Sequence, residues 1–266
     1  MAEDHQLINK WRKCLCQKPP FLFPGDEDVI NENGKNTTCY QSFKDFIESR
    51  DFGSRDDHKL HLGLIPTPYM GNLEKGSIFI LMLNPGLSPL TYYAEHDNDE
   101  YSAALKSNLH QENLDENYPF MFLNPNFSWV SGYWMGKLYR TIEKLSNDLK
   151  IEFKMALSRF AQETCVLQLL PYHAKTFGLP ETALKKLSSV KLIKKYVHDI
   201  IVPKVKNNQA LIIVARKVKF WELSNHHNII KYDGPESRGV PLGPSSRGGK
   251  AILNHLRKSF GLREAP

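Results

Sequence analysis

The chain has 266 residues, 41% of them apolar and 11% aromatic, which suits a globular protein with a sizeable core. No stretch approaches the roughly 18 apolar residues of a membrane span, and the charged N-terminus lacks the apolar run of a signal peptide. The net charge of +6 indicates a mild preference for anionic partners and does not identify nucleic acid. We expect a cytoplasmic protein with no membrane association.

Four cysteines occur, and none forms a CxxC pair. Cys14 and Cys16 are too close together to indicate a disulfide framework. A metal or cluster site built from Cys14, Cys16 and Cys39 is the weaker alternative to ordinary reduced thiols. We expect no metal and no cofactor.

Residues 1–60 are predicted to form a short helix followed by an irregular segment, because the Pro19-Pro20 and Pro24-Gly25 pairs end any early helix. Within this part, residues 40–50 carry apolar side chains at helical spacing. We interpret residues 1–60 as an N-terminal extension packed on a single α/β domain of residues 61–266.

The stretch SIFILMLNPGLSP contains an apolar run from Ile78 to Leu83, which predicts a buried strand. Asn84, Pro85 and Gly86 follow it directly. Ligands of open α/β sheets bind at the carboxyl ends of the strands, and Gly86 allows a ligand close to the backbone. Asn84 would then lie at the mouth of a site, although an ordinary strand-to-loop turn has the same composition.

The segment after this turn is acidic, with a helix predicted near residues 101–110. It leads into an aromatic-rich stretch and a helix from Gly132, with Trp134 and Leu138 on its apolar face. Phe127 and Trp129 are either core residues or residues that stack on bases.

A second buried strand is predicted at residues 164–170, followed by Tyr172 and His173. Gln168 interrupts its apolar run. A buried amide must be hydrogen-bonded, either within the fold or to the edge of a base. His173, just past the strand end, is either structural or a proton-transfer or anion-stabilising group.

The remaining pattern predicts a helix at residues 185–201, strands at 210–215 and 228–232, and a last helix at 252–260. Before that helix comes a loop rich in Gly, Pro, Ser and Arg, which either holds phosphate or is an ordinary surface loop. Strands separated by helices predict a three-layer α/β/α sandwich with a mostly parallel central sheet of about four strands. Walker, HExxH and GxSxG motifs do not occur.

Four motifs follow one another along the chain. They are LNPG after the first core strand, QLLPYH at the end of the second, IIVARKVKFW in and after the third, and the closing Pro/Ser/Arg loop. In this order the chain resembles the uracil-DNA glycosylase superfamily. Mismatch-specific thymine/uracil members carry Asn-Pro-Gly in the first motif, which matches Asn84, Pro85 and Gly86.

The resemblance implies that Asn84 positions a water, while Gln168 contacts the flipped base together with Pro85, Gly86 and Tyr172. It also implies that the closing loop grips phosphates. That loop lacks the family's His before the Pro, so His173 is the substitute candidate for the electrophile. The residues expected to contact DNA are Arg216, Lys217, Arg238, Ser245, Ser246 and Arg247.

The resulting hypothesis is a DNA glycosylase that acts on a flipped, modified or non-canonical pyrimidine, with double-stranded DNA as its partner. The insert at about residues 90–129 would enlarge the pocket, and a phage-defence branch that removes bulky modified cytosines is the narrower form of the hypothesis. The alternatives are a non-catalytic nucleic-acid-binding module of the same fold and a hydrolase of free nucleosides or nucleotides.

Overall fold

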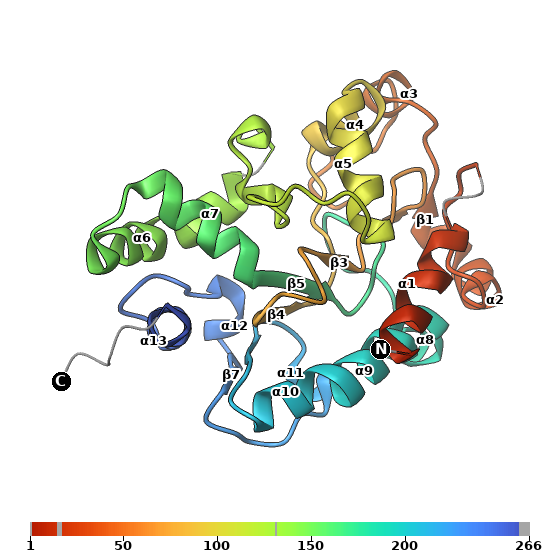
Figure 1. Ribbon diagram of the computed structural model, residues 1–266. Helices are drawn as coiled ribbons and strands as arrows, with labels where there is room; N and C mark the ends of the chain where they lie inside the picture. The colour runs from red at the N-terminus through yellow and green to blue at the C-terminus, as the bar shows by residue number, and fades with distance from the viewer. Residues whose placement is uncertain (1, 15–17, 131, 261–266) are drawn as a thin grey trace. The chain divides into compact units, whose positions relative to one another are not determined.

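The computed structural model describes residues 2–14, 18–130 and 132–260 (Figure 1). The chain folds into two compact units, and neither is one continuous piece of sequence. The first comprises Met1–Tyr69, Leu83–Asn113 and Gln168–Val197, and the second comprises Met70–Met82, Leu114–Leu167 and His198–Pro266. The predicted boundary near residue 60 falls inside the first unit and stays a prediction.

The first unit is mainly helical. A small core of Phe46, Leu64 and Tyr92 forms between α3 and α4, and the predicted helix at residues 40–50 is reduced to α3. Its elements are α1 (Ala2–Cys14), α2 (Glu27–Glu32), η1 (Gly34–Asn36), α3 (Phe43–Ile47), α4 (Pro89–His96), α5 (Asp99–His110), α8 (Glu181–Lys186), α9 (Ser188–Tyr196), and a parallel pair of short strands, β1 (Thr37–Thr38) and β2 (Leu60–His61).

Helix α4 begins directly after the Asn84-Pro85-Gly86 turn, and its start is well specified by the sequence. Ser88 and Thr91 form a capping box, and Pro89 occupies the first turn, where its missing N–H is not needed. Leu87 and Ser88 are the two residues between the Asn84-Pro85-Gly86 turn and the first residue of α4.

The second unit contains a five-stranded sheet, of which only Tyr69 and Gln168, at strand ends, belong to the first unit. Strand β4 runs parallel to β6, and β6 runs parallel to β7. The order is β3 (Tyr69–Met70), β5 (Thr164–Gln168), β4 (Ile78–Met82), β6 (Leu211–Val214) and β7 (Ile229–Lys231).

The four strands predicted from apolar runs are confirmed, and β4 is central. The sheet has five strands, one more than the about four expected. The additional strand, β3, has only two residues in a proline-rich segment, too few to produce a periodic signal.

In the second unit, helices pack on one another and on the sheet. Trp134 and Leu138 are buried on α6 as predicted, and Ile142 is buried with them. Helix α6 packs against α7 (Figure 1), and α13 packs on β6 and β7. The elements are η2 (Met121–Leu123), η3 (Pro125–Phe127), α6 (Gly132–Leu149), α7 (Phe153–Glu163), η4 (Val197–Ile201), α10 (Val202–Lys206), α11 (Val218–Trp221), α12 (Glu236–Gly239) and α13 (Arg247–Ser259).

Two helix predictions need correction. The expected helix at residues 185–201 is divided, because Leu187 adopts an extended backbone between α8 and α9, and η4 continues from α9 as a π-helix. The last helix begins at Arg247 rather than at Ile252, because Ser246 caps it by accepting a hydrogen bond from the Gly249 N–H.

Among the described residues, no helix is long and apolar enough to cross a membrane. Cys14, Cys39 and Cys165 are free thiols, and Cys16 lies outside the described residues. Cys14 donates to the Leu22 carbonyl, and burial raises the pKa of its thiol to about 12. In the described part of the chain, no group of His, Cys, Asp and Glu side chains is arranged to hold a metal ion.

Candidate functional site

Backbone hydrogen bonds tie three segments of the first unit together around Asn84. The segments are residues 65–68, the turn after β4, and the segment that follows β5. The bonds run from Gln168 N to Pro68 O (2.8 Å), from Leu170 N to Leu83 O (2.7 Å), and from Thr67 N to Pro171 O (2.9 Å).

The amide of Asn84 is held in one orientation. Its Nδ2 donates to the carbonyl oxygens of Pro85 (2.7 Å) and Ala174 (3.1 Å). Only the NH₂ group can donate to two carbonyls, so the position of Oδ1 is fixed as well. Oδ1 accepts no hydrogen bond from any described residue, and the half-buried side chain therefore offers a preoriented acceptor.

Gly86 lies exposed at the outer side of the same turn. Its backbone is not in the left-handed region, and a Cβ added there would meet nothing within 4 Å. Its carbonyl accepts a hydrogen bond from Nδ1 of His173 at 2.9 Å. The turn is thus bonded to both His173 and Ala174.

His173 is buried, with 6% of its surface exposed. Its Nε2 lies 3.2 Å from both the Ile65 carbonyl and the Thr67 hydroxyl. Burial lowers the pKa of His173 to about 4, although the Gly86 and Ile65 carbonyls favour the charged form. At neutral pH the ring is therefore uncharged and carries one proton. We assign that proton to Nδ1, because Nδ1 makes the shorter contact with a carbonyl and Nε2 can then accept from the Thr67 hydroxyl.

Glu95 on α4 faces this histidine from inside the fold. One carboxyl oxygen, Oε2, accepts from the Ile65 N–H at 2.7 Å. The other, Oε1, lies 3.7 Å from Nε2 of His173 and has no hydrogen-bond partner. Only 3% of the side chain is exposed, and burial raises the pKa of Glu95 to about 8.

Gln168, at the end of β5, is also buried, and its Oε1 has no hydrogen-bond partner in the described part of the chain. A buried, unpartnered amide oxygen is uncommon and calls for an explanation. Tyr172 differs, since its hydroxyl donates to Asp26 at 2.7 Å and accepts from the Phe23 N–H at 3.1 Å. Its predicted contact with substrate stays a prediction.

A second buried histidine lies next to the first. His61 and His173 form an antiparallel bridge through their backbones. Nε2 of His61 lies 2.9 Å from Oδ2 of Asp57, and Nδ1 lies 2.9 Å from the Tyr92 hydroxyl. Burial lowers the pKa of His61, and Asp57 opposes that effect.

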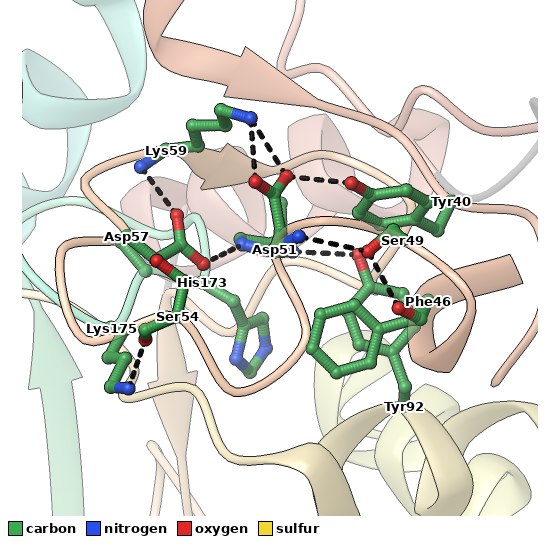
Figure 2. Close-up of polar contacts among 12 residues, drawn as sticks. Tyr40, Phe46, Ser49, Asp51, Ser54, Asp57, Lys59, Tyr92, His173 and Lys175 are labelled. Atoms are coloured by element: carbon green, nitrogen blue, oxygen red, sulfur yellow. Dashed lines mark hydrogen bonds and ion pairs between the residues drawn. The ribbon is translucent and has the colours of Figure 1, made fainter.

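An ion pair borders this network (Figure 2). Nζ of Lys59 donates to both carboxylate oxygens of Asp51, and the Lys59 N–H donates to Asp57. Tyr40 also donates to Asp51, at 2.6 Å. Burial alone would raise the pKa of Asp51, but the bonds from Lys59 and Tyr40 hold it below the ordinary value.

Sequence reasoning missed Glu95, Thr67 and the His61 network. Glu95 stood out only as one member of an acidic segment. The available signal was its spacing, since Thr91 and Tyr92 lie four and three residues earlier and share the buried face of α4. A carboxylic acid on the apolar face of a helix is a candidate for a perturbed pKa.

The predicted DNA contacts of the second unit form two small groups. Nη2 of Arg216 donates to the Arg238 carbonyl at 2.9 Å, and Lys217 follows with a left-handed backbone. At the start of α13, Arg247 pairs with Glu236 and lies over the Tyr232 ring, and Ser246 is the cap. Ser245 is exposed.

The two aromatic residues with open roles separate in the structure. Phe127 is buried, whereas Trp129 is 38% exposed. The first is therefore part of the core, and stacking on bases remains a prediction for Trp129 alone.

Comparisons of the chain with protein-family models, with curated proteins and with solved structures find no match. The chemistry must therefore be argued from the side chains. Near the Asn84 turn, the fixed Asn84 oxygen can orient water or a neutral polar ligand, and the buried Glu95 and His173 side chains beneath it are uncharged. They provide no strong base at neutral pH.

Proposed function

We propose that this chain is a DNA glycosylase that hydrolyses the N-glycosidic bond of a flipped pyrimidine and leaves an abasic site. The observation that carries the proposal is the Asn84 amide. Its nitrogen is anchored by two backbone carbonyls, and its oxygen is left open just after the central strand. The proposal includes a three-layer, glycosylase-like arrangement of the five-stranded sheet.

The reaction fits a site without a strong base. The bond breaks through a cationic sugar and an anionic base, so the water is needed only after much of the positive charge has formed. Asn84 cannot deprotonate that water, because an amide is not a base. It orients the water, and the rate must come from positioning and electrostatics.

The other residues of the first unit take roles consistent with their contacts. The unpartnered Oε1 of Gln168 is buried in the free protein, and in this proposal binding exposes it to accept from the exocyclic amine or ring N–H of the base. His173 is already bonded to Gly86, so in this proposal it holds the turn instead of donating to the base. The loop and backbone around Pro85 form the wall next to the base.

The second unit supplies the proposed contacts with double-stranded DNA. Arg216, Lys217 and Arg238 form one group, and Ser245, Ser246 and Arg247 form the other at the start of α13. Helix N-termini and arginines bind phosphate, and flipping the base costs a few kcal/mol, least for a damaged or mismatched base. A modified cytosine of viral DNA is the narrower proposal for that base.

A base-release assay tests the proposal. Purified protein is incubated with unmodified DNA, with uracil-containing DNA and with phage DNA that carries glucosylated hydroxymethylcytosine, and alkali then cleaves any abasic sites. We expect fragments from one substrate. We expect Asn84→Ala to reduce base release by about 10²-fold or more with DNA binding retained, because only the water is misplaced.

Asn31→Ala, at an exposed position of α2, is the matched control and should behave as the wild type. Full activity of Asn84→Ala would remove Asn84 from the mechanism. Salt-dependent DNA binding without fragments would favour the non-catalytic module, and release of bases from free nucleosides alone would favour the nucleoside hydrolase.

A further inference from the structure

We propose that Glu95 and His173 hold one proton between them beneath the Asn84 turn, and that the turn is set for catalysis only while Glu95 carries that proton. Glu95 is then a positioning residue, which acts on Asn84 through His173 and Gly86. The inference rests on the proposed function and adds to it a regulating group that touches no substrate.

Three hydrogen bonds connect the Asn84-Pro85-Gly86 turn to the segment after β5. Asn84 Nδ2 donates to Ala174 O at 3.1 Å, Ala174 N donates to Pro85 O at 3.3 Å, and His173 Nδ1 donates to Gly86 O at 2.9 Å. The first bond orients the proposed water-positioning amide. The bond from His173 to Gly86 is made by a titratable side chain, so the protonation of His173 affects how the turn is held.

Glu95 lies near Nε2 of His173, on the side of the ring opposite to the Nδ1 atom that bonds to Gly86. Its Oε1 lies 3.7 Å from Nε2 and has no partner, in a side chain that is 97% buried, since 3% is exposed. A proton on Oε1 can approach the Nε2 lone pair and leaves the Nδ1 proton for Gly86. A carboxylate at the same place would put a buried negative charge next to that lone pair.

A buried charge without a partner costs several kcal/mol, so loss of the proton must change the pair. Either the single proton of the neutral His173 ring changes from Nδ1 to Nε2, where it can face the carboxylate, or the Glu95 side chain moves away. Both changes alter the support of Gly86, and with it the position of Asn84.

The charged and titratable groups that face the pair do not remove this cost. Lys106 on α5 and the Ile65 N–H favour the Glu95 carboxylate, but burial outweighs them. The hydroxyls of Tyr92 and Tyr101 are uncharged, since burial raises the pKa of both. His61 faces His173 and disfavours its charged form.

The uncharged pair is therefore the form at neutral pH, with the pKa of Glu95 raised to about 8 and that of His173 lowered to about 4. Base release should fall as the pH rises through about 8, because Glu95 ionises there. The fall should appear in kcat with little change in KM, since the pair does not contact the substrate.

Glu95→Gln tests the inference because an amide copies the protonated acid and cannot ionise. Its carbonyl can accept from Ile65 N, and its NH₂ can face Nε2 of His173. We expect Glu95→Gln to keep base release near neutral pH and to lose the alkaline fall in kcat. Glu100→Gln, at an exposed position of α5, should keep that fall.

Three outcomes would overturn the inference: no alkaline fall in the wild type, the same fall in Glu95→Gln, or a folded Glu95→Gln protein that is inactive at every pH. The last would mean that the carboxylate is needed, contrary to the proposed role.

A second readout does not depend on activity. In protein with ¹⁵N-labelled histidine, the imidazole signals of His173, assigned with His173→Gln, should shift as the pH passes about 8 in the wild type and not in Glu95→Gln. If they do so while no DNA is cleaved, the glycosylase proposal fails and the proton-sharing pair stands. If DNA is cleaved and both readouts are unchanged by Glu95→Gln, the pair fails and the glycosylase stands.

Discussion

His61 and His173 are neighbouring buried histidines that differ in their hydrogen-bond partners. Both rings are buried, and their backbones pair. His61 has a carboxylate at 2.9 Å and a tyrosine hydroxyl at 2.9 Å, so side chains saturate both of its nitrogens. For His173 the nearest carboxyl oxygen is 3.7 Å away, and its nitrogens face backbone carbonyls and a threonine.

The comparison teaches that burial alone does not separate a structural histidine from a functional one. A closed network, such as that of His61, stabilises one conformation and leaves nothing to bind or transfer. The network of His173 is open, because Oε1 of Glu95 is unpartnered and can gain or lose a proton. Substitutions at the two networks should therefore affect different properties.

The largest expected effect is on stability, at the closed network. Asp57→Ala removes the acceptors of both the Lys59 N–H and the His61 ring. A hydrogen bond to a charged group contributes about 1.5–3 kcal/mol, so the loss of two should cost about 3–5 kcal/mol, measured as the free energy of unfolding in urea. Asp56→Ala, at the exposed neighbouring position, is the control; a loss at Asp57 no larger than at Asp56 would break the comparison.

The next largest effect concerns Glu95, whose contribution to the free energy of unfolding should change with pH in a defined direction. The pKa of Glu95 rises from 4.5 to about 8 on folding, so in this interval the folded protein holds a proton that the unfolded chain has released. Wild-type stability contributed by this group therefore falls as the pH rises through the interval. Relative to the wild type, Glu95→Gln should become more stable by a few kcal/mol.

Urea unfolding at about pH 5 and about pH 9 measures this difference. It should be small at the lower pH and large at the higher one, and Glu100→Gln should show no such trend. An equal difference at both pH values would show that Glu95 is not protonated in the folded protein.

The smallest effect is expected in the second unit, at Arg247. Its ion pair with Glu236 is exposed on both sides, at 59% and 56%, so Arg247→Gln should change stability by less than about 1 kcal/mol. If Arg247 contacts a phosphate, the slope of log affinity against log salt should fall by about 1. An unchanged slope would remove Arg247 from the DNA surface, while the histidine comparison would be unaffected.

The sequence predicted the parts of the fold that depend on long apolar runs. Apolar runs predicted strands β4, β5 and β6. Asn84, Gln168 and His173 became candidate site residues because they lie at the ends of these strands. Strand β3 and the break at Leu187 depend on tertiary contacts, which local pattern does not encode.

The candidate site was predictable only in part, for a related reason. Asn84 lies in a recognisable turn, but the free side of its amide depends on Ala174, far away in sequence. Glu95 reads as a charged surface residue unless its helical face is considered. The pairing of Glu95 with His173 depends on how segments distant in sequence come together, which no local pattern contains.

Gly86 gives the turn one further property. The fold would accept a methyl group there, because the backbone is not left-handed and a Cβ would meet no atom within 4 Å. A side chain at this position would therefore extend away from the fold and would contact a bound molecule before it contacted the protein. Whatever an added methyl group displaces lies outside the chain, so the steric penalty on binding would measure how closely a bound molecule approaches the turn.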